Sequence, residues 1–170
     1  MHVRIASLVA VLAILLAAPP ARAQAPGCSG TLSGAVTGAF DCTVAMGKAA
    51  GKAISFVLTP AAKVPGTKAF APGALEIRGP LEKKTYTSRA LGQGKATLTT
   101  EAGAIFTATA GKGGKGEMAL TIAEAERYAQ LPGRYVVNGT YQARLVPAKK
   151  AKKGEVVVDV QFTAASDVLD

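Results

Sequence analysis

Histidine and tryptophan are nearly absent from this sequence. It contains no tryptophan, and its single histidine is His2, close to the N terminus. Ser-His-Asp and Cys-His catalysis both use an imidazole as general base, so a chain that has lost His2 can support neither. The histidine-containing zinc sites of hydrolases are excluded in the same way. Aromatic residues amount to only 5%, which leaves few rings for stacking bases and argues against a specific nucleic-acid partner.

The N-terminal pattern predicts that His2 is removed with a secretory signal peptide. Residues 1–4 carry one positive charge, residues 5–18 form an uncharged apolar run, and Ala21-Arg22-Ala23 has the A-x-A form of a cleavage site. The apolar run is about 14 residues long, whereas a membrane-spanning helix needs about 20. We therefore expect cleavage after Ala23, which leaves residues 24–170 as one secreted or periplasmic domain without a transmembrane segment.

Cysteine is scarce as well, since Cys28 and Cys42 are the only two. An exported protein can keep a disulfide, and two cysteines allow one pairing. Closing a loop of about 15 residues contributes about 3 kcal/mol in the chain-entropy model. Two alternatives stay open, namely an uncleaved membrane anchor and a lipoprotein lipidated on Cys28. A zinc site on the two thiolates would lack a histidine to complete it, so we predict a disulfide and neither a metal nor a cofactor.

Period-two alternation of apolar and polar residues predicts an all-β fold. The clearest strand is the last, in which one face carries Val156, Val158, Val160 and Phe162. Similar alternation marks residues 54–59 and 117–122. Glycines at positions 30, 34 and 38 share the parity of Cys28 and Cys42, where small residues allow a bend or close sheet packing. We expect a single antiparallel β-sandwich of eight or nine short strands, with a barrel as the second choice.

Residues 135–146 allow two interpretations. Asn138-Gly139 is a strong two-residue hairpin signal. A tight hairpin there would mix the apolar and polar faces, whereas one continuous strand keeps Tyr135, Val137 and Tyr141 on one face. We therefore predict one long strand with a weak point or bulge at Gly139. This strand should form a hairpin with the last strand.

The rest of the chain contains weaker signals. Short strands are predicted near residues 75–78, 85–89, 95–100 and 104–110. Loops are expected at the proline and glycine positions Pro60, Pro65-Gly66 and Pro72-Gly73. Helix-forming residues at 123–130 predict one or two helical turns before Pro132-Gly133.

Two glycine-rich segments resemble phosphate-binding loops only formally. Residues 111–116 match G-x-G-x-x-G, but a strand and not a helix is expected to follow, so we interpret them as a flexible hairpin loop. Residues 47–52 have the wrong spacing for a nucleotide-binding loop. Carboxylate pairs are poor candidates for acid–base chemistry, because Glu155 and Asp159 would lie about 13 Å apart along one strand. No catalytic residues are predicted.

Lysine is the most distinctive surface residue, and the formal net charge is +9. One segment carries Lys149, Lys150, Lys152 and Lys153, and another carries Lys112 and Lys115. If these loops gather at one end of the domain, they would attract an anionic polymer or surface. If they do not, the lysines keep the loops solvated and oppose aggregation.

These observations favour an exported, non-enzymatic protein that binds or supports a component of the bacterial envelope or secretome. Its partner would be an anionic envelope polymer or another envelope protein. The alternative is a basic-loop binder of lipopolysaccharide or acidic polysaccharide. A hydrolase that uses paired carboxylates is the third hypothesis.

Overall fold

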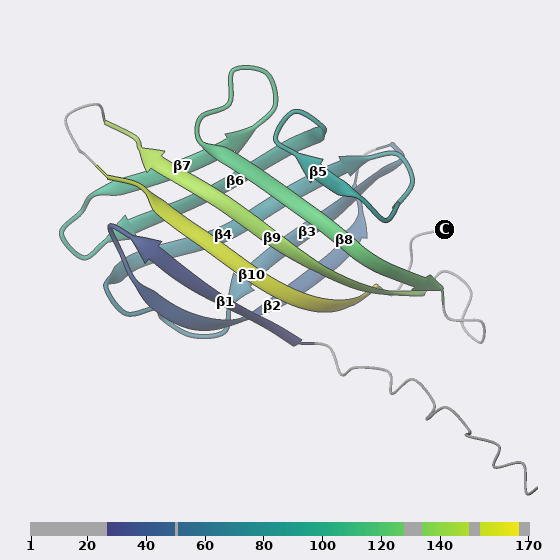
Figure 1. Ribbon diagram of the computed structural model, residues 1–170, viewed down its shortest axis with the longest axis horizontal. Coiled ribbons are helices and arrows are strands. Elements are labelled where there is room, and N and C mark those ends of the chain that lie inside the picture. Colours follow the sequence, from purple (N-terminus) through teal and green to yellow (C-terminus); the bar gives the residue numbers. More distant parts are fainter. Residues whose placement is uncertain (1–26, 50, 128–133, 150–153, 167–170) are drawn as a thin grey trace, which may run out of the picture.

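In the computed structural model, residues 27–49, 51–127, 134–149 and 154–166 are described, and all regular structure within these ranges is β-strand (Figure 1). There are ten strands where the sequence predicted eight or nine: β1 (Gly27–Gly34), β2 (Gly38–Lys48), β3 (Ala53–Pro60), β4 (Thr67–Arg78), β5 (Thr85–Thr87), β6 (Leu91–Thr100), β7 (Ile105–Ala110), β8 (Glu117–Arg127), β9 (Tyr135–Pro147) and β10 (Val156–Ser166).

Eight of these strands close into an antiparallel barrel in the order β1-β2-β3-β4-β6-β7-β9-β10. The all-β prediction is confirmed, but the sandwich was wrong and the barrel, our second choice, is correct. Strand β9 closes the ring because it pairs with β10 along one edge and with β7 at Val146 and Pro147 on the other. Strand β10 then pairs with β1, so no gap separates two independent sheets.

Strands β8 and β5 extend the barrel wall outside this ring. Strand β8 follows the edge of β9 from the Glu117–Arg144 pair to the Arg127–Tyr135 pair, and β5 pairs with the other edge of β8. In Figure 1, β8, β9, β10 and β1 form a front layer that crosses the strands behind it. Strands β2 and β9 take part in both layers.

The predicted apolar rows point into the barrel. The row of β10 is confirmed, since Val156, Val158, Val160 and Phe162 are all buried. The rows of β3 and β8 are buried too, and they comprise Ile54, Phe56, Leu58, Met118, Leu120 and Ile122. The barrel interior is therefore filled by side chains, as is usual for a barrel of this size.

The helical turns predicted at residues 123–130 were wrong as far as Arg127, because β8 continues to that residue. Residues 128–130 lie outside the described ranges. Ala and Glu favour a helix locally, but here the backbone finds partners on β9 as far as Tyr135. Ladder pairing outweighs a helix propensity of a few tenths of a kcal/mol per residue.

The loop predicted at Pro72-Gly73 was also wrong, because both residues lie inside β4. The register against β6 shifts between Ala71 and Ala74, which accommodates the proline at an irregularity. Gly73 is needed for close approach, since a Cβ there would lie 2.9 Å from the Tyr141 hydroxyl oxygen. Proline and glycine thus mark a bulge in a strand, and not a turn.

The prediction that β9 runs unbroken through Asn138-Gly139 is confirmed, and so is its hairpin with β10. The bulge is on the neighbouring strand, where the register shifts between Ile122 and Glu124 opposite Gly139. The parity of the side chains was thus a better guide than the dipeptide.

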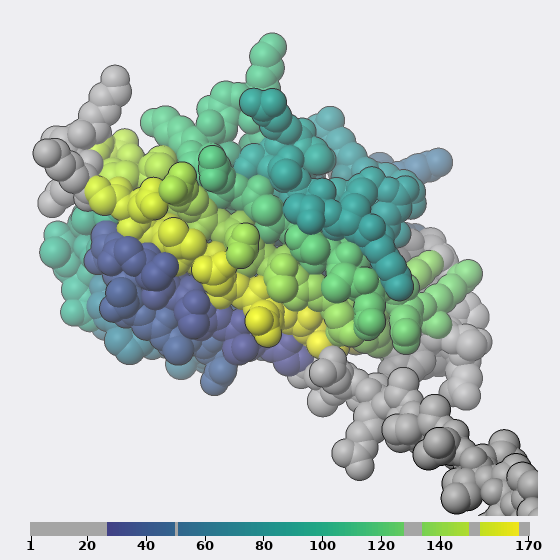
Figure 2. Space-filling model, viewed as in Figure 1, coloured from purple at the N-terminus to yellow at the C-terminus, as the bar shows by residue number. Residues whose placement is uncertain are grey.

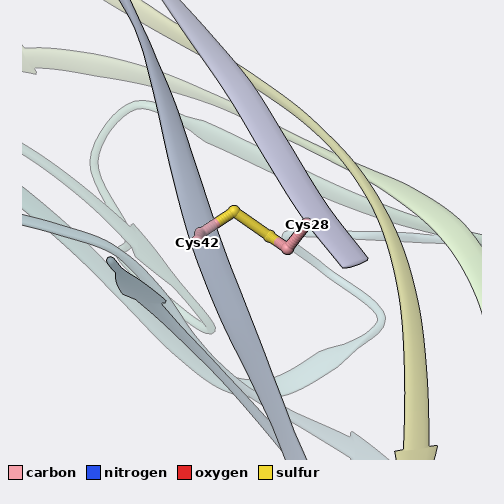
Figure 3. Close-up of a disulfide and its surroundings, with 2 residues drawn as sticks. All are labelled: Cys28 and Cys42. Atoms are coloured by element: carbon pink, nitrogen blue, oxygen red, sulfur yellow. A yellow bond between two sulfur atoms is a disulfide. The ribbon is translucent and has the colours of Figure 1, made fainter. Parts of the chain in front are cut away.

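The predicted disulfide joins Cys28 on β1 to Cys42 on β2, with the two Cα atoms 4.8 Å apart (Figure 3). It ties the first strand of the barrel to the second, where the backbone ladder between them extends only from Gly38 to Asp41 of β2. The small residue at Gly30 is also explained, since a Cβ there would lie 2.8 Å from the Asp159 carbonyl oxygen.

The two ends of the barrel differ. At one end, the β1–β2 turn and the β3–β4 loop each place a valine in the core, Val36 and Val64, with exposed fractions of 9% and 2%. The Thr67 hydroxyl donates to the Val64 carbonyl at 2.7 Å and fixes the loop there. We call this the plugged end. The opposite end is formed by the β2–β3 turn, the segment after β4 and the start of β9.

Candidate functional site

Three of the six predicted lysines, Lys112, Lys115 and Lys149, lie within the described residues, and they are not all close together. Lys149 follows β9 near the start of β7, where the Ala148 amide donates to the Ile105 carbonyl at 2.9 Å. Lys112 and Lys115 lie in the loop that follows Ala110, at the other end of β7. The six residues of β7 separate the two groups by about 17 Å at about 3.3 Å per residue. Lys150, Lys152 and Lys153 lie outside the described residues.

A polar face covers the outside of β1, β10, β9 and β8, the strands seen side by side in Figure 2. An open hollow of about 730 Å³ lies over β1, β2, β10 and β9. Its polar side chains include Asp41, Thr140 and Gln161, and the Gln142 amide donates to Asp159 at 2.8 Å. These groups are suited to hydrogen bonding, and Lys63, which also lines the hollow, already pairs with Glu101 at 3.1 Å.

A second open hollow of about 740 Å³ continues along the same face toward β8. Arg144 provides its central charge, but its guanidinium already pairs with Glu155 at 3.0 Å and with Glu117 at 4.0 Å. The hollow shares Gln142 and Asp159 with the first. Exposed ion pairs of this kind contribute about 0–1 kcal/mol. Arg89 also lines this hollow, and its neighbours there include Glu117 and Asp159, so both signs of charge are present.

The third hollow differs in chemistry and lies at the end opposite the plugged one. It has a volume of about 530 Å³, and residues from both layers of the barrel wall line it. One side is formed by the β2–β3 turn and the segment after β4, and the other by the start of β9. Its lining residues are Lys48, Gly51, Lys52, Ala53, Ile54, Gly79, Pro80, Leu81 and Tyr135. We call it the mouth hollow.

The carboxylates that the sequence singled out are engaged with other side chains. Glu155 pairs with Arg144, and Asp159 accepts from Gln142. A further carboxylate is that of Glu124, which accepts from the Asn138 amide at 3.0 Å. Within the described residues, no group of three or more His, Cys, Asp or Glu side chains could hold a metal ion. The described ranges also contain no helix long and apolar enough to cross a membrane.

The mouth hollow was missed from the sequence, although one signal pointed to it. Phe40, Cys42, Val44 and Met46 form the inward row of β2, and Lys48 is the next residue of that row. A cation at the end of an apolar row indicates that the row reaches an opening. The sequence alone did not show where β2 ends, so this lysine was counted only as surface charge.

The hydroxyl of Tyr141 is a polar atom buried inside the barrel. Its side chain is fully buried, and the oxygen has no hydrogen-bond partner. Burial raises the pKa of Tyr141 far above its ordinary value, because the charged phenolate would be cut off from water. This hydroxyl stays neutral and is a cost to stability, not a reactive group.

Tyr141→Phe should therefore stabilise the protein by about 1 kcal/mol, because it removes an unpaired buried polar group. The gain should grow above a pH of about 10, where the unfolded tyrosine loses its proton and the folded one does not. Urea unfolding of both proteins at neutral and at high pH measures this difference. A variant less stable than the unaltered protein would contradict an unpaired Tyr141 hydroxyl. So would a difference in unfolding free energy that does not change with pH.

The fold and its hollows define a small disulfide-tied antiparallel barrel, plugged at one end and hollow at the other. The chain matches no family model, no curated protein and no solved structure. Its function must therefore be argued from its own residues.

Proposed function

We propose that this chain is an exported, non-enzymatic binding protein of the bacterial envelope or secretome. The observation that carries the binding role is the mouth hollow, since the mouths of β-barrels are frequent ligand sites. Export is supported by the signal-peptide pattern of residues 1–23 and by the Cys28–Cys42 disulfide, a bond that persists in oxidising compartments.

A binding role is preferred to catalysis because the polar side chains described above interact with one another. The carboxylates on the outer face accept hydrogen bonds from neighbouring side chains or form ion pairs, as described for Asp159 and Glu155. The deeply buried Tyr141 hydroxyl is held neutral. A paired-carboxylate hydrolase needs one carboxyl with a raised pKa facing a second across a substrate cleft.

Fractionation of a bacterial host that expresses the full chain tests export. The protein is expected in the periplasm or medium, beginning at Gln24 and resistant to thiol-specific alkylation until it is reduced. An intact N terminus on a cytoplasmic, reduced protein would exclude the exported role. A lipid-modified Cys28 would replace it with the lipoprotein alternative.

A second candidate function is binding of an anionic polymer, such as lipopolysaccharide or acidic polysaccharide, through the basic loops. The net charge favours it, since the full chain carries +9 and loss of Arg4 and Arg22 with the signal peptide leaves +7. Lys149, Lys112 and Lys115 are also exposed, and none of them forms an ion pair within the described residues. Retention of the mature protein on an anionic polysaccharide matrix separates the two functions. If alanine at positions 149, 150, 152 and 153 leaves the eluting salt concentration unchanged, this candidate is wrong.

A further inference from the structure

The geometry points to the mouth hollow as a binding site for a single-chain amphiphile with an anionic headgroup. The apolar chain would enter between the two layers of the barrel, and a carboxylate or phosphate headgroup would lie between Lys48 and Lys52. This inference rests on the proposed binding function and names the class of ligand.

The floor of the hollow is apolar. Ala53 and Ile54 are buried, with exposed fractions of 9% and 7%, and Leu81 packs partly buried against the core. Pro80 adds further apolar surface beside Leu81. Because the hollow continues the inward side of the barrel wall, an alkyl chain placed there would replace water on apolar surface.

The rim is cationic. Lys48 ends the inward row of β2, so its stem lies along the opening, and Lys52 lies in the following turn beside Gly51, whose φ is +72°. A long lysine stem can cover apolar surface while its ammonium group stays in water. This arrangement places charge at the rim and hydrocarbon below it.

Among the described residues, the two cations at the rim have no acidic counterpart. No acidic residue lines the hollow, and neither Lys48 nor Lys52 forms an ion pair in the part of the chain that the structure describes. Lys84, in contrast, pairs with Glu82, and this hydrogen bond raises the pKa of Lys84. An anion can therefore gain charge-assisted hydrogen bonds at the rim without displacing an existing partner.

The opposite wall contributes polar atoms as well. Tyr135 begins the inward row of β9 and lines the hollow, and its backbone partner on β10 is Ser166. The Ser166 hydroxyl is buried and has no hydrogen-bond partner. Ser166 does not line the hollow, so Tyr135 is the residue of this wall that a ligand would meet.

The size and charge of the hollow decide between ligand classes. Its volume of about 530 Å³ lies within the range of about 300–1,000 Å³ that is typical of small-molecule sites. A polymer would need charge spread over a larger surface, whereas Lys149 lies at the opposite end of β7 from Lys112 and Lys115. The apolar floor and the two rim cations together match one alkyl chain with one anionic group.

Isothermal titration of the purified, oxidised mature protein tests this inference with decanoate and decyl phosphate as probes. Decanamide serves as the uncharged control, and acetate as the control without an alkyl chain. At least one of the two anionic probes should bind, and acetate should not. Lys48→Gln/Lys52→Gln should weaken binding of the anionic probe about tenfold or more and leave the affinity for decanamide unchanged.

The matched control is Lys112→Gln/Lys115→Gln, which removes the same charge from the β7–β8 loop and should change nothing. If both double variants weaken binding of the anionic probe equally, the effect is one of net charge and the mouth hollow is not the binding site. A second measurement needs no variant. Decanoate should shield Lys48 and Lys52 of the unaltered protein from amine acetylation, read by mass spectrometry, and leave Lys112 and Lys115 reactive.

Absence of binding, or shielding that does not distinguish these lysines, overturns the inference. If the exported, oxidised protein ignores both probes but binds anionic vesicles, the surface and not the mouth hollow is the site. The proposed function fails separately, through the export experiment, so the two outcomes can be told apart.

Discussion

Replacing Cys28 and Cys42 with serine is expected to lower the free energy of unfolding by about 3 kcal/mol, the value for cross-linking a loop of about 15 residues. The loss should be large because the bond joins β1 to β2, where their ladder ends at Asp41. The midpoint temperature of thermal unfolding should fall by roughly 10 °C, a shift that circular dichroism measures.

The control for this prediction is chemical reduction. Dithiothreitol should destabilise the unaltered protein by about the same amount as the double substitution and should leave the Cys28→Ser/Cys42→Ser protein unchanged. If the unaltered protein is as stable when reduced as when oxidised, the link between β1 and β2 does not stabilise the barrel. The protein would then not need an oxidising compartment for its stability.

The inward and outward faces of the strands were predictable from the sequence, because a half-buried strand must alternate. Val158 and Val160 are buried, and the Asp159 between them lies on the outer face, as the pattern required. The closure of the barrel was not predictable in this way. A sandwich and a barrel need the same alternation, and the difference lies in whether β9 finds partners on both edges.

Local propensity misled in two places where tertiary pairing decides the conformation. Residues 123–127 are helix-forming by composition, yet β9 offers them a ladder. Pro72-Gly73 is typical of a turn, yet it lies in β4 because Gly73 admits the ring of Tyr141 from the opposite wall. Residues 123–127 pair with the next strand along the chain, and Gly73 contacts a residue much further on, so both outcomes depend on partners that a short local window does not contain.

The candidate site was the least predictable part. The disulfide followed from counting cysteines, but the mouth hollow depends on three separate segments that meet only after the barrel closes: the β2–β3 turn, residues 79–81 and Tyr135. Of the lysines that stand out in the sequence, the described ones are divided between the two ends of β7, with Lys149 near its start and Lys112 and Lys115 after its end. Proximity along the chain did not show where these charges lie in space.

Gly139→Ala is expected to destabilise the protein by about 3 kcal/mol, at the upper end of the usual cost of overpacking. Gly139 faces Ile122 on one side and Phe162 on the other. A Cβ there would overlap the carbonyl oxygen of Thr121 and lie 2.9 Å from the Phe162 ring. The carbonyl belongs to the backbone ladder and cannot move without breaking it, so a methyl group disrupts the wall.

The matched control is Gly47→Ala on β2. A Cβ at this position meets only the Ser55 hydroxyl, at 3.8 Å, which is ordinary contact. Alanine there should be neutral or stabilise by about 0.5 kcal/mol, because it restricts the unfolded chain. Urea unfolding of the two variants should therefore separate them by about 3 kcal/mol. Equal stability of the two variants would mean that β9 is not packed as closely between β8 and β10 at Gly139 as the structure shows.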